Sequence, residues 1–98
     1  MEDLVTGTVL VQNTIINTLV VELNNASLIL AVAPKGFLMC GYLDITTAEK
    51  LKDAACVITG VKTVEELLSK PVVKLTPAAQ TLGITLGMSG RKALEKMI

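Results

Sequence analysis

Histidine and tryptophan are absent from the 98-residue sequence, and Phe37 and Tyr42 are its only aromatic residues. Without histidine, Ser-His-Asp and Cys-His catalytic groups and histidine-based zinc sites are excluded, within one subunit and between identical subunits. Two aromatic side chains make no platform for stacking nucleic-acid bases. No GxxxxGK[ST] or GxGxxG phosphate-binding loop occurs either. The sequence therefore predicts no cofactor, no metal site and no nucleic-acid partner.

Lysine and arginine are absent from residues 1–34, whose charged residues are Glu2, Asp3 and Glu22. Residues 35–98 hold all nine basic residues and six acidic ones, an excess too small to predict a basic binding face. The acidic start lacks the basic region of a secretory signal, and no apolar run reaches the ~18 residues of a membrane span. We expect a cytoplasmic protein with no membrane partner.

Hydrophobic residues make up 51% of the chain, which excludes a disordered protein. At this length we expect a single domain over residues 1–98. Its composition divides it into a β-rich oligomerisation region at 1–34 and an α/β part at 35–98. In a cytoplasmic chain, Cys40 and Cys56 are expected to remain reduced thiols.

Valine, threonine and isoleucine dominate residues 4–12 and 14–23, which predicts two strands. A third strand is expected in the apolar run 27–33, which Pro34 and Gly36 end. Tight turns are expected at Gln12-Asn13 and at Asn24-Asn25, because asparagine tolerates a positive φ. The predicted strands therefore form antiparallel hairpins.

Both faces of these strands are apolar. In the second strand, Ile15 and Leu19 fall on one face and Ile16 and Val20 on the other. An antiparallel sheet normally shows one polar face to water. Either another subunit covers the second face in a homo-oligomer, or the chain's own helices cover one face and the other stays partly exposed.

The α/β part begins with a predicted strand at 37–43. Thr46 and Glu49 have the spacing of a capping box, which predicts a helix that starts after Thr46 and runs to about residue 55. A short buried strand is expected at 56–60. Residues 37–60 therefore predict a βαβ unit with a right-handed crossover.

Three further helices are predicted from their N-terminal signals. Thr63 opens a second capping box, Thr76 precedes Pro77 in a helix that Gly83 ends, and residues 87–90 lead into the last helix. Short extended segments are expected at 72–75 and 84–86. The predicted fold class is α+β: antiparallel N-terminal strands, then a βαβ unit and short helices in a single compact domain.

Four ordered motifs carry a family resemblance, at residues 36–44, 60–68, 78–84 and 87–94. In this order they resemble the YunC-like family of small bacterial and archaeal proteins, a domain of unknown function. The resemblance implies a compact α+β domain whose N-terminal β region serves tetramerisation. It implies no reaction.

Cys40 is the one candidate nucleophile. It precedes Gly41 at the end of a predicted strand, and Asp44 follows in the same turn. A cation or helix end that lowered the thiol pKa would activate it. The alternative is that Cys40 is a small buried hydrophobe, that Asp44 satisfies backbone N–H groups of the turn rather than acting as a general base, and that Cys56 has no role.

Ser89, Gly90 and Arg91 are a candidate anion site at the start of the last helix. Free N–H groups, a hydroxyl and the adjacent cations Arg91 and Lys92 suit a phosphate or carboxylate. The alternative is that Ser89 is a plain N-cap and that Arg91 pairs with an acidic side chain.

Two functions follow from these features. The first is a non-catalytic homo-oligomeric binding or scaffold module, expected to be a tetramer, assembled through residues 1–34. The second is a small-molecule-binding enzyme that uses Cys40 and the anion site at Ser89, Gly90 and Arg91. Its partner would be a small anionic ligand.

Overall fold

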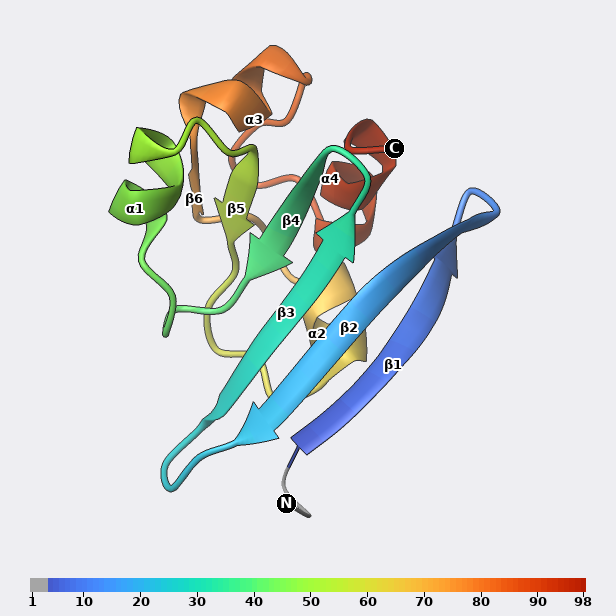
Figure 1. Cartoon of the computed structure of the whole chain (residues 1–98), viewed down its shortest axis with the longest axis vertical. Helices are drawn as coiled ribbons and strands as arrows, with labels where there is room; N and C mark the ends of the chain where they lie inside the picture. Colours follow the sequence, from blue (N-terminus) through green and yellow to red (C-terminus); the bar gives the residue numbers. More distant parts are fainter. Residues whose placement is uncertain (1–3) are drawn as a thin grey trace.

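A six-stranded sheet organises the computed structural model, which describes residues 4–98. Its strands lie side by side in chain order (Figure 1). They are β1 (Leu4–Val11), β2 (Thr14–Glu22), β3 (Ser27–Ala33), β4 (Gly36–Met39), β5 (Ala55–Val57) and β6 (Lys74–Leu75). All neighbours pair antiparallel except β4 and β5, which are parallel.

Four short helices complete the fold: α1 (Ile45–Lys50), α2 (Val64–Ser69), α3 (Pro77–Thr81) and α4 (Gly90–Lys96). Helix α1 connects the parallel strands β4 and β5, so the predicted βαβ unit is confirmed. The α+β class is confirmed with it. In the part of the chain that the structure describes, no helix has the length and apolarity to cross a membrane.

The three predicted N-terminal strands are confirmed, and so is the turn between the first two. Gln12 and Asn13 adopt φ values of 50° and 62°, the left-handed pair that a two-residue hairpin turn needs. This turn fixes the register in which Leu10 faces Ile15. Residues at alternate positions of β1 and β2 consequently point to the same sheet face.

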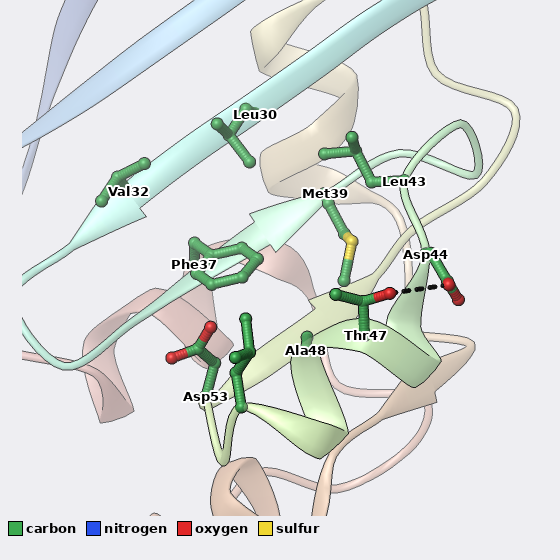
Figure 2. A pocket seen from close by; sticks show the side chains of 10 residues that line it. Leu30, Val32, Phe37, Met39, Leu43, Asp44, Thr47, Ala48 and Asp53 are labelled. Carbon is green, nitrogen blue, oxygen red and sulfur yellow. Dashed lines mark hydrogen bonds between the residues drawn. The ribbon is translucent and has the colours of Figure 1, made fainter.

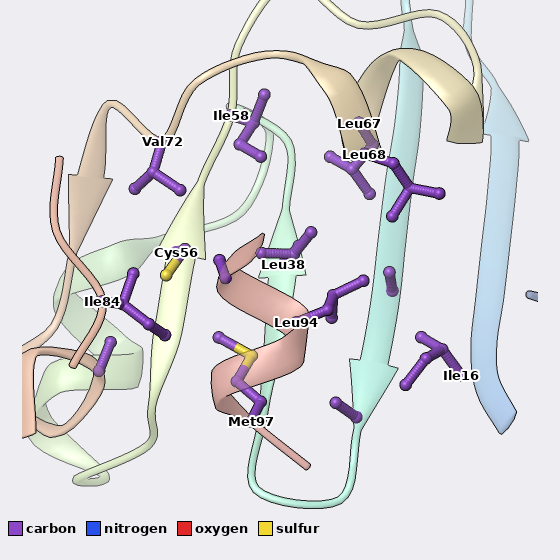
Figure 3. Close-up of a cluster of buried hydrophobic side chains, with 14 of the residues drawn as sticks. Ile16, Leu38, Cys56, Ile58, Leu67, Leu68, Val72, Ile84, Leu94 and Met97 are labelled. Carbon is purple, nitrogen blue, oxygen red and sulfur yellow. The ribbon is translucent and has the colours of Figure 1, made fainter. Parts of the chain in front are cut away.

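Helices α2 and α4 cover one face of the sheet. Leu67 and Leu68 of α2 and Leu94 and Met97 at α4 pack on the sheet residues of that face, among them Leu38 (Figure 3). These side chains are at most 8% exposed. This layer is the main hydrophobic core.

The other face is covered only in part. Helix α1 packs Ala48 on Met39, Ala55 and Val57, which makes a second, smaller buried cluster over β4 and β5. Beside it, no helix of the described residues lies on the same face of β1–β3. We call it the open sheet face; it consists of Thr6, Thr8, Leu10, Ile15, Asn17, Leu19, Val21, Leu30 and Val32.

Two boundary predictions in the βαβ unit are wrong. The strand predicted at 37–43 ends at Met39, because the chain turns where the Leu43 N–H donates to the Cys40 carbonyl. The helix predicted to reach residue 55 ends at Lys50, because Ala55 has to pair with Phe37 in the parallel ladder. The strand predicted at 56–60 is therefore Ala55–Val57.

The predicted N-cap of α1 is also wrong. Asp44 caps this helix instead of Thr46, since its carboxylate accepts from the Thr46 N–H at 2.9 Å and from the Thr47 hydroxyl at 2.8 Å. The Asp44 carboxylate has two acceptor oxygens for the donors at the helix start, whereas a Thr46 cap has a single hydroxyl oxygen.

The N-caps of the other helices are as predicted: Thr63 for α2, Thr76 for α3 and Ser89 for α4. Gly83 follows α3 with φ +93°. The extended segments were overestimated: β6 is only Lys74–Leu75, and residues 84–86 form no strand. Strand β6 pairs with β5 over two residues only, and in the segment 84–86 the Ile84 N–H donates to the Ala79 carbonyl rather than to a neighbouring strand.

Thr76 is the one buried polar side chain among the described residues, at 1% exposure. Its hydroxyl donates to the Asp53 carbonyl at 2.7 Å and accepts from the N–H groups of Ala55 and Ala79. The cap of α3 thereby also fixes the start of β5. This hydroxyl holds the βαβ unit to the rest of the chain.

Candidate functional site

A groove lies between the open sheet face and helix α1 (Figure 2). Its volume is about 380 Å³, within the range of small-molecule and peptide sites. Apolar side chains line most of it: Leu30, Val32, Phe37, Met39, Leu43 and Leu51. We call it the α1 groove.

Two carboxylates border the α1 groove. Asp44 lies on one side and Asp53 on the other (Figure 2). The hydrogen bond from the Thr47 hydroxyl, followed by that from the Thr46 N–H, lowers the pKa of Asp44 below its ordinary value. Asp44 is therefore a charged helix cap at neutral pH. This agrees with the interpretation that it serves the turn.

Cys40 lines a different pocket, of about 240 Å³, together with Ser27, Tyr42 and Thr59. This pocket lies at the carboxyl ends of the parallel strands β4 and β5, where ligands bind in many α/β sheets. The thiol is 3% exposed and accepts a hydrogen bond from the Ile29 N–H at 3.3 Å. Cys40 is thus a buried residue at the base of a pocket.

Cys56 is fully buried within β5, and burial raises the pKa of its thiol to about 12. At neutral pH it is a protonated thiol that fills space in the core. Both cysteines are free. The sequence assigned no role to Cys56, and its environment in β5 agrees.

Ser89 and Arg91 line a third pocket with Glu65, Leu68 and Ser69. The Ser89 hydroxyl accepts from the Lys92 N–H at 3.3 Å, and the Gly90 N–H donates to the Lys70 carbonyl at 3.1 Å. The N–H groups of Gly90 and Lys92 at the start of this helix therefore donate within the fold rather than to an anion. Arg91 is the exposed cation of this pocket.

Gly90 has a packing role that the sequence did not reveal. A Cβ atom at this position would overlap the Leu67 carbonyl oxygen and come within 2.9 Å of Ile58 Cδ1. Glycine therefore lets α4 approach α2 closely. The glycine of the motif at residues 87–94 is therefore explained by helix packing and requires no ligand.

The predicted site residues lie in three places. Cys40, Asp44 and Ser89 with Arg91 line three different pockets, so the structure does not bring them together. Across residues 4–98, no group of three or more cysteine, aspartate or glutamate side chains is arranged to hold a metal ion. Sequence reasoning missed the α1 groove, because only the tertiary fold brings Leu51, just after the end of α1, close to Leu30 and Phe37.

These features define an α+β domain with a helix-covered core on one side of its sheet and an open apolar face on the other. Residues 39–97 match the family model described as a domain of unknown function, DUF1805, and the chain belongs to that family. The predicted YunC-like resemblance is confirmed.

Two relatives illustrate the match. The chain is 48% identical over 67 residues to the uncharacterized protein YunC of Bacillus subtilis, a stretch that covers 64% of this chain and spans 66% of that relative's length. The crystal structure of a protein of unknown function, TA1206 from Thermoplasma acidophilum, matches with a TM-score of 0.92 and 32% identity. That match covers 97% of this chain and 93% of the other, so the N-terminal strands belong to the shared fold.

The packing role of Gly90 predicts the effect of G90A. Overpacking a helix contact in this way costs about 1–3 kcal/mol, so G90A is expected to lower the free energy of unfolding by at least that much. The measurement is urea unfolding followed by circular dichroism. G41A is the matched control, because its Cβ would lie 3.5 Å from Thr59 Cγ2, an ordinary contact. Equal midpoints for the two variants would contradict the packing role.

Proposed function

We propose that the protein is a non-catalytic binding or scaffold module that assembles as a homo-oligomer through its N-terminal β region. One observation carries the proposal: the open sheet face exposes large aliphatic side chains that none of the helices in residues 4–98 covers. Leu10 is 64% exposed, Ile15 63% and Val32 40%. Adjacent apolar side chains on one face are typical of an interaction surface.

The partner proposed for this face is a second copy of the chain. The open sheet face carries no charged residue, and Glu22, the one charged residue of β1–β3 in residues 4–34, alternates to the opposite face. Two copies can therefore pack together without burying an unpaired charge. An uncharged face is self-complementary in this respect.

A second self-complementary feature supports a tetramer. Strand β1 is an edge of the sheet, and its residues 4–11 carry no charge and no proline, the usual protections of an edge strand. Face packing and edge pairing are two different isologous contacts. They generate a closed assembly of four subunits when their two-fold axes cross at right angles.

A cytoplasmic location is part of the same proposal. Cys40 and Cys56 are separate buried thiols, which suits a reducing compartment. The net charge of zero adds no attraction to anionic lipid surfaces.

The exposed position of Ile15 makes I15K a direct test of the assembly. Ile15 touches no core in the protomer, so the variant should fold, but in the assembly it would bury an unpaired charge at a cost of about 3–5 kcal/mol. Sedimentation velocity is expected to show smaller species for I15K than for the unmodified protein.

L86K is the matched control for I15K. Leu86 is also 63% exposed but lies outside the β region, so L86K should leave the sedimentation coefficient unchanged. If I15K and L86K sediment alike, the open sheet face is not the assembly surface.

A second candidate function is small-molecule chemistry at the Cys40 pocket. It is supported by the position of the thiol beside Ser27, Tyr42 and Thr59 at the carboxyl ends of two parallel strands. The proposal rests on this pocket alone, since Ser89 and Arg91 line another one. Cys40 would be the nucleophile.

Iodoacetamide labelling of the native protein tests this second candidate. Cys40 is expected to be alkylated at least about tenfold faster than Cys56, whose raised pKa leaves almost no thiolate. Peptide mass spectrometry separates the two sites. Equal slow rates would show that both thiols react only on unfolding, and the enzyme candidate would lose its basis.

A further inference from the structure

The α1 groove and the exposed pair Leu10 and Ile15 lie on the same face of the sheet. These two residues face each other across β1 and β2. In the register of the sheet, Asn17 faces Val32, and Val32 faces Phe37 of the groove. Asn17, Val32 and Phe37 thus form one row across three strands, and this row reaches the groove. Ile15 is two residues from Asn17, so the exposed pair Leu10 and Ile15 lies only about 7 Å from this row along the strand direction.

Helix α1 gives this face the shape of a step. It covers β4 and β5 and leaves β1–β3 bare. Two copies cannot stack with α1 opposite α1, because the helices would hold the sheets apart. They fit when the bare strands of one copy lie beside α1 of the other.

A two-fold axis parallel to the strands produces this arrangement. Rotation about such an axis turns the faces toward each other, keeps each position along the strands and exchanges β1–β2 with β4–β5. The Leu10 and Ile15 pair of one copy then lies over the α1 groove of its partner. Aligned sheets packed about 10 Å apart are a common form of sheet-on-sheet contact.

The area of the bare strands shows why the groove has to take part. Eight residues at about 3.3 Å and three strands at about 4.8 Å give a flat area of about 380 Å². A standard stable interface buries about 800 Å² on each partner. The sheet alone supplies roughly half of this area, and the groove with the adjacent side of α1 is the apolar surface next to it.

The polar groups of the two surfaces also match. Gln12 and Asn13 form the exposed tip next to Leu10 and Ile15. Their side-chain amides are neutral donors, which suit a carboxylate such as Asp53 at the border of the groove. Contact between them brings no like charges together.

We propose that the α1 groove is completed by a second copy of this chain, whose Leu10 and Ile15 fill it about a two-fold axis parallel to the strands. This inference rests on the proposed self-assembly and specifies which residues of the partner occupy the groove. Each subunit gives one hairpin and receives one, so the two grooves of a pair are filled simultaneously.

Disulfide trapping tests the arrangement. In an I15C/L51C double variant, mild oxidation should link two chains, because the proposed arrangement places position 15 of one chain next to position 51 of the other. Within one chain the two positions are separated by at least two strand spacings, about 10 Å, and a disulfide needs Cα atoms within about 7 Å. Non-reducing electrophoresis detects the dimer.

The matched control is I15C/L86C, since Leu86 and Leu51 are both exposed leucines, at 63% and 68%. The I15C/L51C dimer is expected to form at least about tenfold faster, as close apposition raises the effective thiol concentration. Equal rates in a protein that is still oligomeric by light scattering would overturn the groove arrangement and leave the proposed assembly intact. A protein that is monomeric by light scattering would overturn both.

A fluorescent apolar dye distinguishes a small-molecule occupant. If the partner fills the groove, the unmodified protein should bind the dye weakly and the I15K variant should bind it more strongly. Equal strong binding by both proteins would mean that the groove is open in the assembly, which contradicts the inference and favours a small apolar ligand.

Discussion

The limited cover that α1 gives to one sheet face is the constraint on which the rest of the structure depends. Helices α2 and α4 are both used on the opposite face, where they build the main core with residues such as Leu38 and Leu94. Helix α1 has six residues and covers only β4 and β5. Three strands therefore keep an apolar face with no helix on it. In a chain of 98 residues, this is the surface that association with another copy would bury.

Two of the motif glycines, Gly36 and Gly90, have a packing role in the fold. A Cβ at Gly36 would come within 2.5 Å of the Ala54 carbonyl oxygen, and one at Gly90 would overlap the Leu67 carbonyl. Gly36 lets β4 start against the end of the crossover, and Gly90 lets α4 lie against α2. These contacts hold the helix layer tightly on one face. The motifs at residues 36–44 and 87–94 therefore include packing positions, while Cys40, Gly41 and Gly60 of the motifs line the Cys40 pocket.

Local signals in the sequence predicted much of the fold. The β-branched runs and the Gln12-Asn13 turn gave the hairpin, and threonine and serine caps located α2, α3 and α4. Features that depend on tertiary pairing were not predictable. The end of α1 is set by the pairing of Ala55 with Phe37. Its N-cap is Asp44, although the sequence is compatible with either Asp44 or Thr46 in that position. The apolar character of both sheet faces was visible, but which of them the helices cover was not.

The candidate site was harder to predict for the same reason. The α1 groove is lined by residues from separate elements: Leu30 lies in β3, Phe37 in β4 and Leu51 just after α1. Only the parallel crossover places them around one groove. The side-chain chemistry of Cys40, Asp44 and Arg91 suits a single site, but the three residues line separate pockets. The proposed assembly depends on burial of the open sheet face by identical subunits. Light scattering on the unmodified protein at micromolar concentration measures this most directly: a tetramer has a molar mass of about four times that of the 10.4 kDa protomer, and a monomer of 10.4 kDa would contradict the proposed assembly.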